Sequence, residues 1–436
     1  MNIEAQRSLP RHRFVARLFN AEPHEVPALL LSFGFFFCIL CGYYIQRPMR
    51  DETNVFFGRD FIAWAFTITF MVMLALVPLF GWLVSRVARR IIIPWVYAIV
   101  LGALGVFWIL LLTAPNNYYV GMAFVVWVNV FILFVVSLFW SFMSEFWSTA
   151  QAKRLFGAIS IGGSLGGLTG PILIQALVYR IAAAHLLLAS AAFTALGLAF
   201  YFAMLRLADG GGGSKAHDAP EKGGVLDGAI NVWRSPYLFR IGLWILLGTL
   251  FGQYFYMEQA RIFGAAYSDR AQTLEIQARV ENAAVTLTML FELFVTARLI
   301  AFLGVGRTMA LGPICLLVAF VALMWSPTVA VIATISVIMR SLDYGVTGPA
   351  MRVLWTVVEP ADKYRAQNFN DTLVYRGGGV AGAWGVTTFM NMAHGVGLAA
   401  APVITAVAAP VTIAWAWLAL DLGKRFDAKT SQRPPR

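Results

Sequence analysis

The sequence predicts an all-α polytopic membrane protein, in which twelve helices cross the bilayer in two related six-helix halves. Of its 436 residues, 59% are hydrophobic and only 13% are charged, whereas a soluble domain carries about 25% charged residues. Apolar runs of roughly 18–25 residues recur along the chain, and each is long enough to cross a bilayer as a helix. The runs lack the period-2 alternation of a membrane β-barrel, so helices are the expected spanning elements.

The apolar runs place the spans in chain order. They are expected at residues 25–46, 61–84, 92–113, 119–143, 156–179, 182–205, 237–257, 283–303, 308–325, 328–350, 368–392 and 397–420. The resulting divisions are a basic tail (1–24), an N-terminal bundle (25–206), a linker (207–236), a C-terminal bundle (237–420) and a second tail (421–436). The linker contains "DGGGGSKAHDAPEKGG", a low-complexity composition typical of a flexible connector.

The distribution of basic residues predicts the orientation. Of the 33 Lys and Arg residues, 24 fall on the side of the two termini and seven on the other side. Because cytoplasmic loops carry the excess of Lys and Arg, both termini are expected in the cytoplasm. The net charge of +11 is thereby explained without nucleic acid as a partner. The polar, basic start of the chain and the long apolar run behind it do not match a cleavable signal peptide.

Two glycine-rich segments at equivalent positions indicate an internal duplication. "GAISIGGSLGGLTGP" follows "EFWSTAQAKR" in span five, and "GGGVAGAWG" follows "EPADKYRAQ" near span eleven. Such a 6+6 arrangement resembles the major facilitator superfamily. "GWLVSRVARR" between spans two and three resembles that superfamily's loop motif, with Ser85 in place of its aspartate. The glycines are expected to permit close helix packing rather than to bind a ligand.

Polar side chains recur at helical spacing inside several spans. The faces are Ser137, Trp140, Ser141 and Ser144 with Glu145 in span four; Thr249, Gln253 and Tyr256 in span seven; Thr288, Glu292 and Thr296 in span eight; Arg340, Asp343, Tyr344 and Thr347 in span ten; and Asn368, Asp371, Thr372 and Tyr375 with Arg376 in span eleven. Burying a charge at the bilayer centre costs about 2.5–3.5 kcal/mol, so these faces are expected to line a cavity. The alternatives are structural pairs, of Arg340 with Asp343 or of Arg376 with Asp371 or Glu359.

The end of the first span, "YYIQRPMRDETN", also carries polar side chains at helical spacing. Six of its residues fall within about 120° of one another on a helix. They are Tyr43, Tyr44, Arg47, Arg50, Asp51 and Asn54. Glu52 points away and is expected in solvent. This arrangement requires the helix to continue through Pro48; if it ends there, Arg50 and Asp51 belong to a loop or outer gate.

Nothing in the sequence predicts a catalytic or metal site. Cys38 and Cys41 form a C-x-x-C inside an apolar run, where they are expected to act as small apolar residues. The five histidines have no spaced partner, and no Walker-type motif occurs. We therefore expect neither a metal nor a cofactor, and no enzymatic activity.

Four segments resemble the bacterial branch of the ATP/ADP translocase family. They are "FFFCILCGYYIQRPMRDETNV", "AQAKRLFGAISIGGSLGGLTGP", "LFELFVTARLIAFLGVGR" and "DKYRAQNFNDTLVYRGG". The resemblance implies exchange of nucleotides across a bacterial cytoplasmic membrane. It places the family's first-helix arginine, lysine and aspartate on Arg47, Arg50 and Asp51, and its membrane-embedded acidic residue on Glu292. Arginine at position 50 keeps the charge of the lysine but not its geometry.

We therefore expect a monomeric secondary transporter that works by alternating access on a phosphate-bearing, nucleotide-like anion. The expected substrate contacts are Tyr44, Arg47, Arg50, Asp51, Gln253, Tyr256, Arg340, Tyr344 and Arg376. The expected coupling or gating residues are Glu145, Glu292, Asp343 and Asp371. One alternative is a proton-coupled carrier of another organic or amphiphilic solute. The other is a non-transporting scaffold, in which neutralising Arg340 or Arg376 alters assembly without abolishing flux.

Overall fold

The computed structural model describes residues 21–87, 89–209, 232–395 and 400–432. Most of the predicted N-terminal tail, most of the predicted linker and the first residues of the twelfth span therefore lie outside the described residues. Within the described ranges the regular elements are all helical. Ten helical segments there are long and apolar enough to cross a membrane, and α16 and α17 cover the last two predicted spans. The predicted all-α polytopic fold is confirmed.

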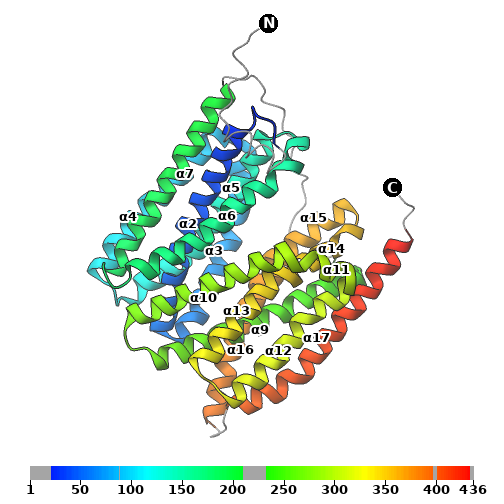
Figure 1. Ribbon diagram of the computed structural model, residues 1–436. Helices are drawn as coiled ribbons and strands as arrows, with labels where there is room; N and C mark the ends of the chain where they lie inside the picture. Colours follow the sequence, from blue (N-terminus) through cyan, green and yellow to red (C-terminus); the bar gives the residue numbers. More distant parts are fainter. Residues whose placement is uncertain (1–20, 88, 210–231, 396–399, 433–436) are drawn as a thin grey trace. The chain divides into compact units, whose positions relative to one another are not determined.

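The helices follow the predicted spans in order (Figure 1). They are α2 (Val26–Phe57), α3 (Arg59–Arg86), α4 (Arg89–Thr113), α5 (Tyr118–Phe146), α6 (Thr149–Leu177), α7 (Leu186–Asp209), α9 (Pro236–Ala266), α10 (Arg270–Leu290), α11 (Thr296–Leu303), α12 (Val305–Trp325), α13 (Val329–Leu342), α14 (Gly348–Leu354), α15 (Pro360–Phe369), α16 (Tyr375–Gly395) and α17 (Ala400–Ser431). Shorter 3₁₀ turns are η2 (Ala183–His185) and η5 (Trp355–Val357), and π-helical turns are η3 (Phe291–Val295), η4 (Asp343–Thr347) and η6 (Asn370–Val374).

Polar side chains at helix starts explain several boundaries. Asn117 caps α5 by accepting from two backbone amides, and Ser148 forms a capping box with Gln151 at the start of α6. Ser235, followed by proline, caps α9, and Asp269 caps α10. Each cap satisfies backbone N–H groups that have no partner within the helix.

The chain divides into two compact units, which are described separately. Unit 1 contains α2 as far as Arg50 and the chain from Leu76 through α7. Unit 2 contains residues 51–75 and the helices from α9 onward. The last turns of α2 and the first part of α3 thus make their contacts with the C-terminal helices.

In unit 1, α2 packs against α6 through glycines (Figure 1). A Cβ atom at Gly166 would overlap the carbonyl oxygen of Phe37 and lie 2.8 Å from the amide nitrogen of Cys41. A Cβ at Gly170 would lie 2.8 Å from the carbonyl carbon of Tyr44. Only glycine permits these distances, so the predicted packing role of this segment is confirmed.

A polar cluster fixes the start of α2 to the start of α6 in unit 1. Glu25, which directly precedes α2, accepts from Gln151 Nε2 at 2.8 Å and from Arg154 at 3.0 Å. Burial raises the pKa of Glu25, but hydrogen bonds from the amide of Glu22 and from these two side chains outweigh that effect, and its pKa lies below the usual 4.5. The cluster is therefore stabilising only while Glu25 is ionised.

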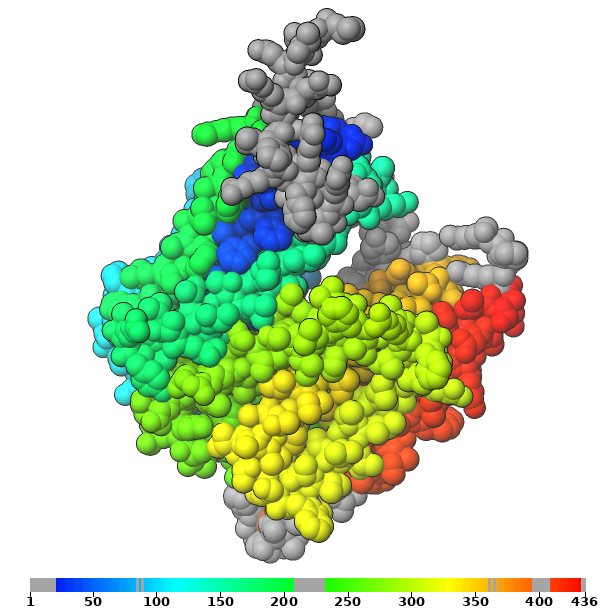
Figure 2. Space-filling view, viewed as in Figure 1, coloured from blue at the N-terminus to red at the C-terminus, as the bar shows by residue number. Residues whose placement is uncertain are grey.

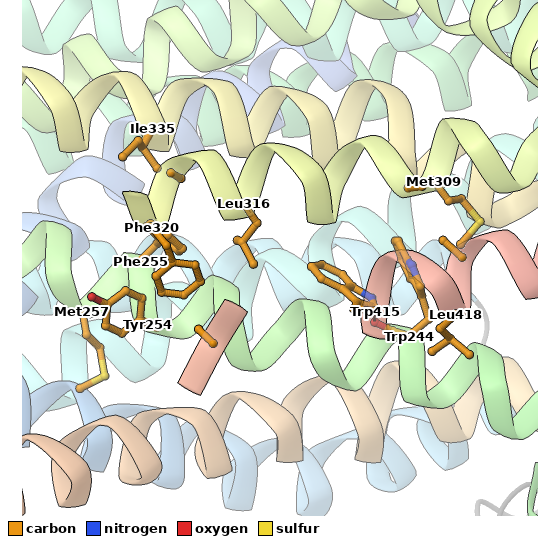
Figure 3. Close-up of a cluster of buried hydrophobic side chains, with 14 of the residues drawn as sticks. Trp244, Tyr254, Phe255, Met257, Met309, Leu316, Phe320, Ile335, Trp415 and Leu418 are labelled. Carbon is orange, nitrogen blue, oxygen red and sulfur yellow. Dashed lines mark hydrogen bonds between the residues drawn. The ribbon is translucent and has the colours of Figure 1, made fainter. Parts of the chain in front are cut away.

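The core of unit 2 lies between α9, α12 and α17 (Figure 3). Tyr254 of α9 stacks on Phe320 of α12, with ring centroids 5.3 Å apart. The indole nitrogen of Trp415 donates to the carbonyl oxygen of Trp244 at 3.1 Å. Large aromatic side chains thus fill the space between these three helices.

The outer surface of unit 2 is apolar in part. Helices α10 to α13 form much of the face of unit 2 that is visible in Figure 2. On α12, Ile314, Val318 and Trp325 are exposed. Apolar side chains without protein partners on a membrane-length helix are expected to contact lipid.

Candidate functional site

Helix α2 continues through Pro48 and ends at Phe57, so the predicted helical phase of the first span holds. Its 32 residues correspond to a length of about 48 Å, which exceeds a hydrocarbon core of about 30 Å. Gly58, with a φ of +85°, then begins the connection to α3. The charges after Pro48 therefore belong to a helix and not to a loop.

The part of the α2 polar face in unit 1 carries the two arginines. The guanidinium of Arg47 lies 5.6 Å from the ring centroid of Tyr44, within the range of a cation–π interaction. Arg50 donates to the amide oxygen of Asn129 on α5 at 2.7 Å. Both arginines are half-buried. Asn129 was not predicted, because it is the only strongly polar residue in its part of an apolar span.

The part of the same face in unit 2 centres on Tyr256. The Tyr256 hydroxyl donates to Asp51 Oδ1 at 2.7 Å and accepts from Asn54 Nδ2 at 2.6 Å. Asp51 and Asn54 are each only 2% exposed. The structure thus brings together two predicted site residues, Asp51 and Tyr256, and adds Asn54 as their partner.

The prediction that Glu52 lies in solvent is wrong. Glu52 is buried, and both of its carboxylate oxygens accept from Arg270 at the start of α10, at 2.5 and 2.9 Å. The Arg270 guanidinium also lies 4.2 Å from the ring centroid of Phe56. Helical phase correctly separates Glu52 from the Asp51 face, but it does not reveal that another helix covers this side of α2.

A small cavity lies beside this ion pair. Its volume is about 160 Å³, and its walls include Glu52, Arg270, Tyr267 and Thr273. Sites for drug-sized ligands measure about 300–1,000 Å³. This cavity is too small for the predicted nucleotide-like solute.

Three π-helical turns interrupt spans eight, ten and eleven in unit 2, and each contains a predicted coupling residue. Glu292 lies in η3, Asp343 in η4 and Asp371 in η6. All three side chains are exposed, meaning that other parts of the chain do not cover them. π-turns of this kind are frequent at functional sites.

The first two π-turns are bonded to each other. The Thr296 hydroxyl donates to the carbonyl oxygen of Phe291 at 2.9 Å and to that of Gly345. A Cβ at Gly345 would lie 3.0 Å from Phe291 Cβ and 3.2 Å from the carbonyl oxygen of Thr288. Glycine at position 345 therefore lets η4 approach η3 closely.

The π-turns correct the predicted polar faces, because a π-turn inserts one residue and shifts the helical phase of the residues after it. In span ten, Asp343 and Tyr344 are exposed, whereas Thr347 is only 3% exposed. The Thr347 side chain nevertheless bonds that of Asp343, so these two members of the predicted stripe remain neighbours. In span eleven, Asn370 is fully buried, and neither its Oδ1 nor its Nδ2 has a hydrogen-bond partner among the described residues.

Arg352 on α14 exerts an attractive electrostatic effect on each of the three carboxylates separately. It interacts with Glu292, Asp343 and Asp371, and Arg376 also interacts with Asp371. The side chain of Arg352 makes no hydrogen bond or ion pair with any residue that the structure describes. Arg352 was not among the predicted site residues, because it falls just after span ten.

Arg340 is part of a buried ion pair. Its guanidinium donates to Glu281 Oε2 of α10 at 2.7 Å, and the two side chains are 17% and 3% exposed. The predicted alternative of a pair with Asp343 in its own helix is therefore replaced by a pair between α13 and α10. Glu281 was not among the predicted residues.

The remaining predicted residues lie in different surroundings. Gln253 is 5% exposed, and its Nε2 has no hydrogen-bond partner among the described residues. Tyr344 in η4 is exposed, Arg376 on α16 is half-buried, and Glu145 is exposed at the end of α5. No cluster of three metal-ligating side chains occurs within the described ranges, and the three cysteines are not disulfide-bonded.

Comparisons with known proteins identify the fold. No protein-family model and no curated protein match the sequence. Among solved structures, the nucleoside transporter NupG is 14% identical, with a TM-score of 0.64 over 92% of this chain and 98% of that one. A bacterial homologue of the iron transporter ferroportin, in its inward-facing state, is 12% identical, with a TM-score of 0.63 over 98% and 100% of the two chains.

A third similar structure is an auto inhibited peptide transporter of the POT family. It is 14% identical, with a TM-score of 0.62 over 94% of this chain and 97% of that one. These proteins have the twelve-helix major facilitator fold, and the predicted major facilitator-like fold of this chain is thereby confirmed.

Proposed function

We propose that this protein is a secondary active transporter that works by alternating access on a phosphate-bearing, nucleotide-like anion, by exchange. The observation that carries the proposal is the polar face of α2, where Arg47 and Arg50 lie one turn apart with Tyr44 and Asn129 beside them. Guanidinium groups bind phosphate through paired donors, and aromatic rings can stack on a base. The resemblance of this segment to ATP/ADP translocases supports the same class of solute.

The proposal also specifies the oligomeric state, the membrane and the orientation of the protein. It is a monomer in the bacterial cytoplasmic membrane, with both termini in the cytoplasm. The ratio of 24 to seven basic residues on the two sides supports this orientation. The likeness to secondary transporters of nucleosides, peptides and iron supports transport as the general activity, because the fold class is shared.

Counterflow in proteoliposomes tests the substrate class. Labelled ATP, ADP and other phosphorylated solutes are offered to vesicles that contain, or lack, the same unlabelled solute. We expect uptake only with solute inside, and at least a tenfold loss of uptake in Arg50→Gln. Arg279→Gln is the matched control, because Arg279 is exposed and its one ion pair among the described residues is with Glu275 on its own helix. Intact protein that transports no phosphorylated anion would refute this substrate class.

Proton-coupled transport is the second candidate, and the three carboxylates on π-turns favour it. Glu292, Asp343 and Asp371 are protonatable groups within spans of unit 2, a common arrangement for coupling residues. The same vesicles distinguish the two modes. Proton coupling predicts that an imposed pH gradient drives uptake into vesicles without internal solute, whereas exchange predicts that it does not.

A further inference from the structure

Two arginines share one carboxylate in unit 2, where α17 leaves the predicted twelfth span beside the start of α9. Asp421 Oδ2 pairs with the Nε atom of Arg240 at 2.9 Å and accepts from the Nε atom of Arg425 at 2.7 Å. The side chains of Arg240 and Arg425 are 26% and 43% exposed. One carboxylate oxygen thus holds two partly exposed guanidinium groups by their inner nitrogens.

This cluster carries more positive than negative charge. Asp421 balances one of the two arginines, Lys424 beside them is exposed, and the formal charges of Asp427 and Lys429 in the next turn cancel. The two Nη atoms of Arg425 make no hydrogen bond or ion pair within the described ranges. Terminal guanidinium donors of this kind bind phosphate oxygens.

An exposed apolar stripe of α17 leads directly to the cluster. Ile413, Trp417 and Leu420 are 60%, 63% and 39% exposed, and they lie within about 60° of one another on the helix. Lys424 continues the same stripe by one turn, whereas Trp415 is buried in the core of the unit (Figure 3). The stripe from Ile413 to Leu420 is about 10 Å long, so it can contact part of an acyl chain.

Aromatic side chains at the start of α9 mark the depth of the cluster in the membrane. Trp233 and Phe239 are 72% and 38% exposed, their ring centroids are 5.3 Å apart, and Phe239 directly precedes Arg240. Exposed tryptophan at the end of a span is typical of the membrane–water interface. The arginines are therefore expected at the depth of the lipid headgroups, with the apolar stripe in the hydrocarbon.

We propose that Arg240 and Arg425 bind the phosphate of an anionic phospholipid, one acyl chain of which lies along the Ile413–Leu420 stripe of α17. Asp421 keeps the two guanidinium groups together against their mutual repulsion. A free phosphate ion fits the guanidinium groups equally well, but it makes no use of the apolar stripe. The orientation proposed above places this end of unit 2 in the cytoplasmic leaflet, where anionic lipids are abundant.

Native mass spectrometry of the purified full-length protein tests this site without any transported solute. Dissociation constants are measured for phosphatidylglycerol and for phosphatidylcholine, and inorganic phosphate is added as a competitor in a further arm. Arg240→Gln, Arg425→Gln and their combination are compared with Arg298→Gln. Arg298 is the matched control, because it is exposed on α11 of the same unit and donates to the carbonyl oxygen of Phe294 in its own turn.

Each single substitution is expected to weaken phosphatidylglycerol binding about fivefold, and the double substitution about 25-fold, with little change for phosphatidylcholine. Trp417→Ala should weaken the binding of both lipids, because it removes the largest side chain of the stripe. A protein that is merely destabilised loses both lipids alike, so the ratio of the two dissociation constants is the decisive quantity.

An unchanged ratio in the double variant, or an equal change in Arg298→Gln, overturns the proposal. Displacement of phosphatidylglycerol by inorganic phosphate at the concentration of the lipid overturns it in favour of a free-anion site. Unchanged lipid binding in Trp417→Ala overturns the placement of the acyl chain on α17.

Discussion

Replacing Tyr256 by phenylalanine tests the contact between the end of α2 and α9. The substitution removes one oxygen atom, which donates to Asp51 and accepts from Asn54 at 2.7 and 2.6 Å. The ring keeps its place beside Phe66, with centroids 6.0 Å apart. The change therefore isolates the two hydrogen bonds from the packing of the ring.

The magnitude follows from the burial of the two partners. Asp51 and Asn54 are each 2% exposed, so water does not readily replace the lost hydroxyl. A hydrogen bond to a charged group contributes about 1.5–3 kcal/mol, and one between neutral groups about 0.5–1.5 kcal/mol. Interhelical hydrogen bonds measured in membranes average only about 0.6 kcal/mol. We expect Tyr256→Phe to lower the free energy of unfolding by about 1–3 kcal/mol.

Unfolding of the purified protein in mixed micelles measures this quantity directly. Tyr119→Phe is the matched control, because Tyr119 is 79% exposed at the start of α5. In a double-mutant cycle, Asn54→Ala should cost less in the Tyr256→Phe background than in the wild type, since the bond is already lost. If Tyr256→Phe is as stable as Tyr119→Phe, or if the two effects simply add, the hydroxyl does not hold α2 to α9.

Three further substitutions test other contacts, the first two by the same unfolding assay and the third by melting temperature. Thr296→Val should lose about 1 kcal/mol, because Gly345 then lacks its hydroxyl donor; unchanged stability would argue against the bond between η3 and η4. Gly166→Ala should lose about 1–3 kcal/mol, whereas Gly157→Ala on the same helix, with nothing within 4 Å of its added Cβ, should not. The lowered pKa of Glu25 stabilises the protein above pH 4.5 and ceases to do so as pH falls through the folded-state pKa. The melting temperature of the wild type should therefore fall more steeply below pH 4.5 than that of Glu25→Gln, and parallel curves would contradict this.

The sequence was sufficient to predict the helices because lipid imposes a simple rule on each span. It was also sufficient for the face of α2 that carries Arg47, Arg50 and Asp51, since this helix keeps regular phase through Pro48. The sequence could not predict which residues form ion pairs with each other. Glu52 and Arg270 are 218 residues apart in the chain, and hydrophobic periodicity contains no information about which helix covers which face.

The π-turns were missed for a different physical reason. Hydrophobic periodicity assumes 3.6 residues per turn, and a single inserted residue changes the direction of every later side chain. Thr347 is buried, whereas Asp343 and Tyr344 of the same π-turn are exposed. "DYGVTG" contains two glycines and a threonine whose hydroxyl donates to the carbonyl oxygen of Leu342, five residues earlier. Such a composition indicates a local irregularity, but not its kind.

The polar chemistry differs between the two units although their helices follow one another in the same pattern. Among the described residues, π-turns occur only in unit 2, where each carries a carboxylate, whereas the α2 face in unit 1 carries Arg47 and Arg50. Irregular turns and the unpaired amide of Asn370 lower stability. A fold selected for stability alone would have regular helices at these three places. We therefore expect anion recognition to depend on α2, and the response to protons to depend on the carboxylates of the π-turns, so that substitutions in the two groups alter solute affinity and pH dependence separately.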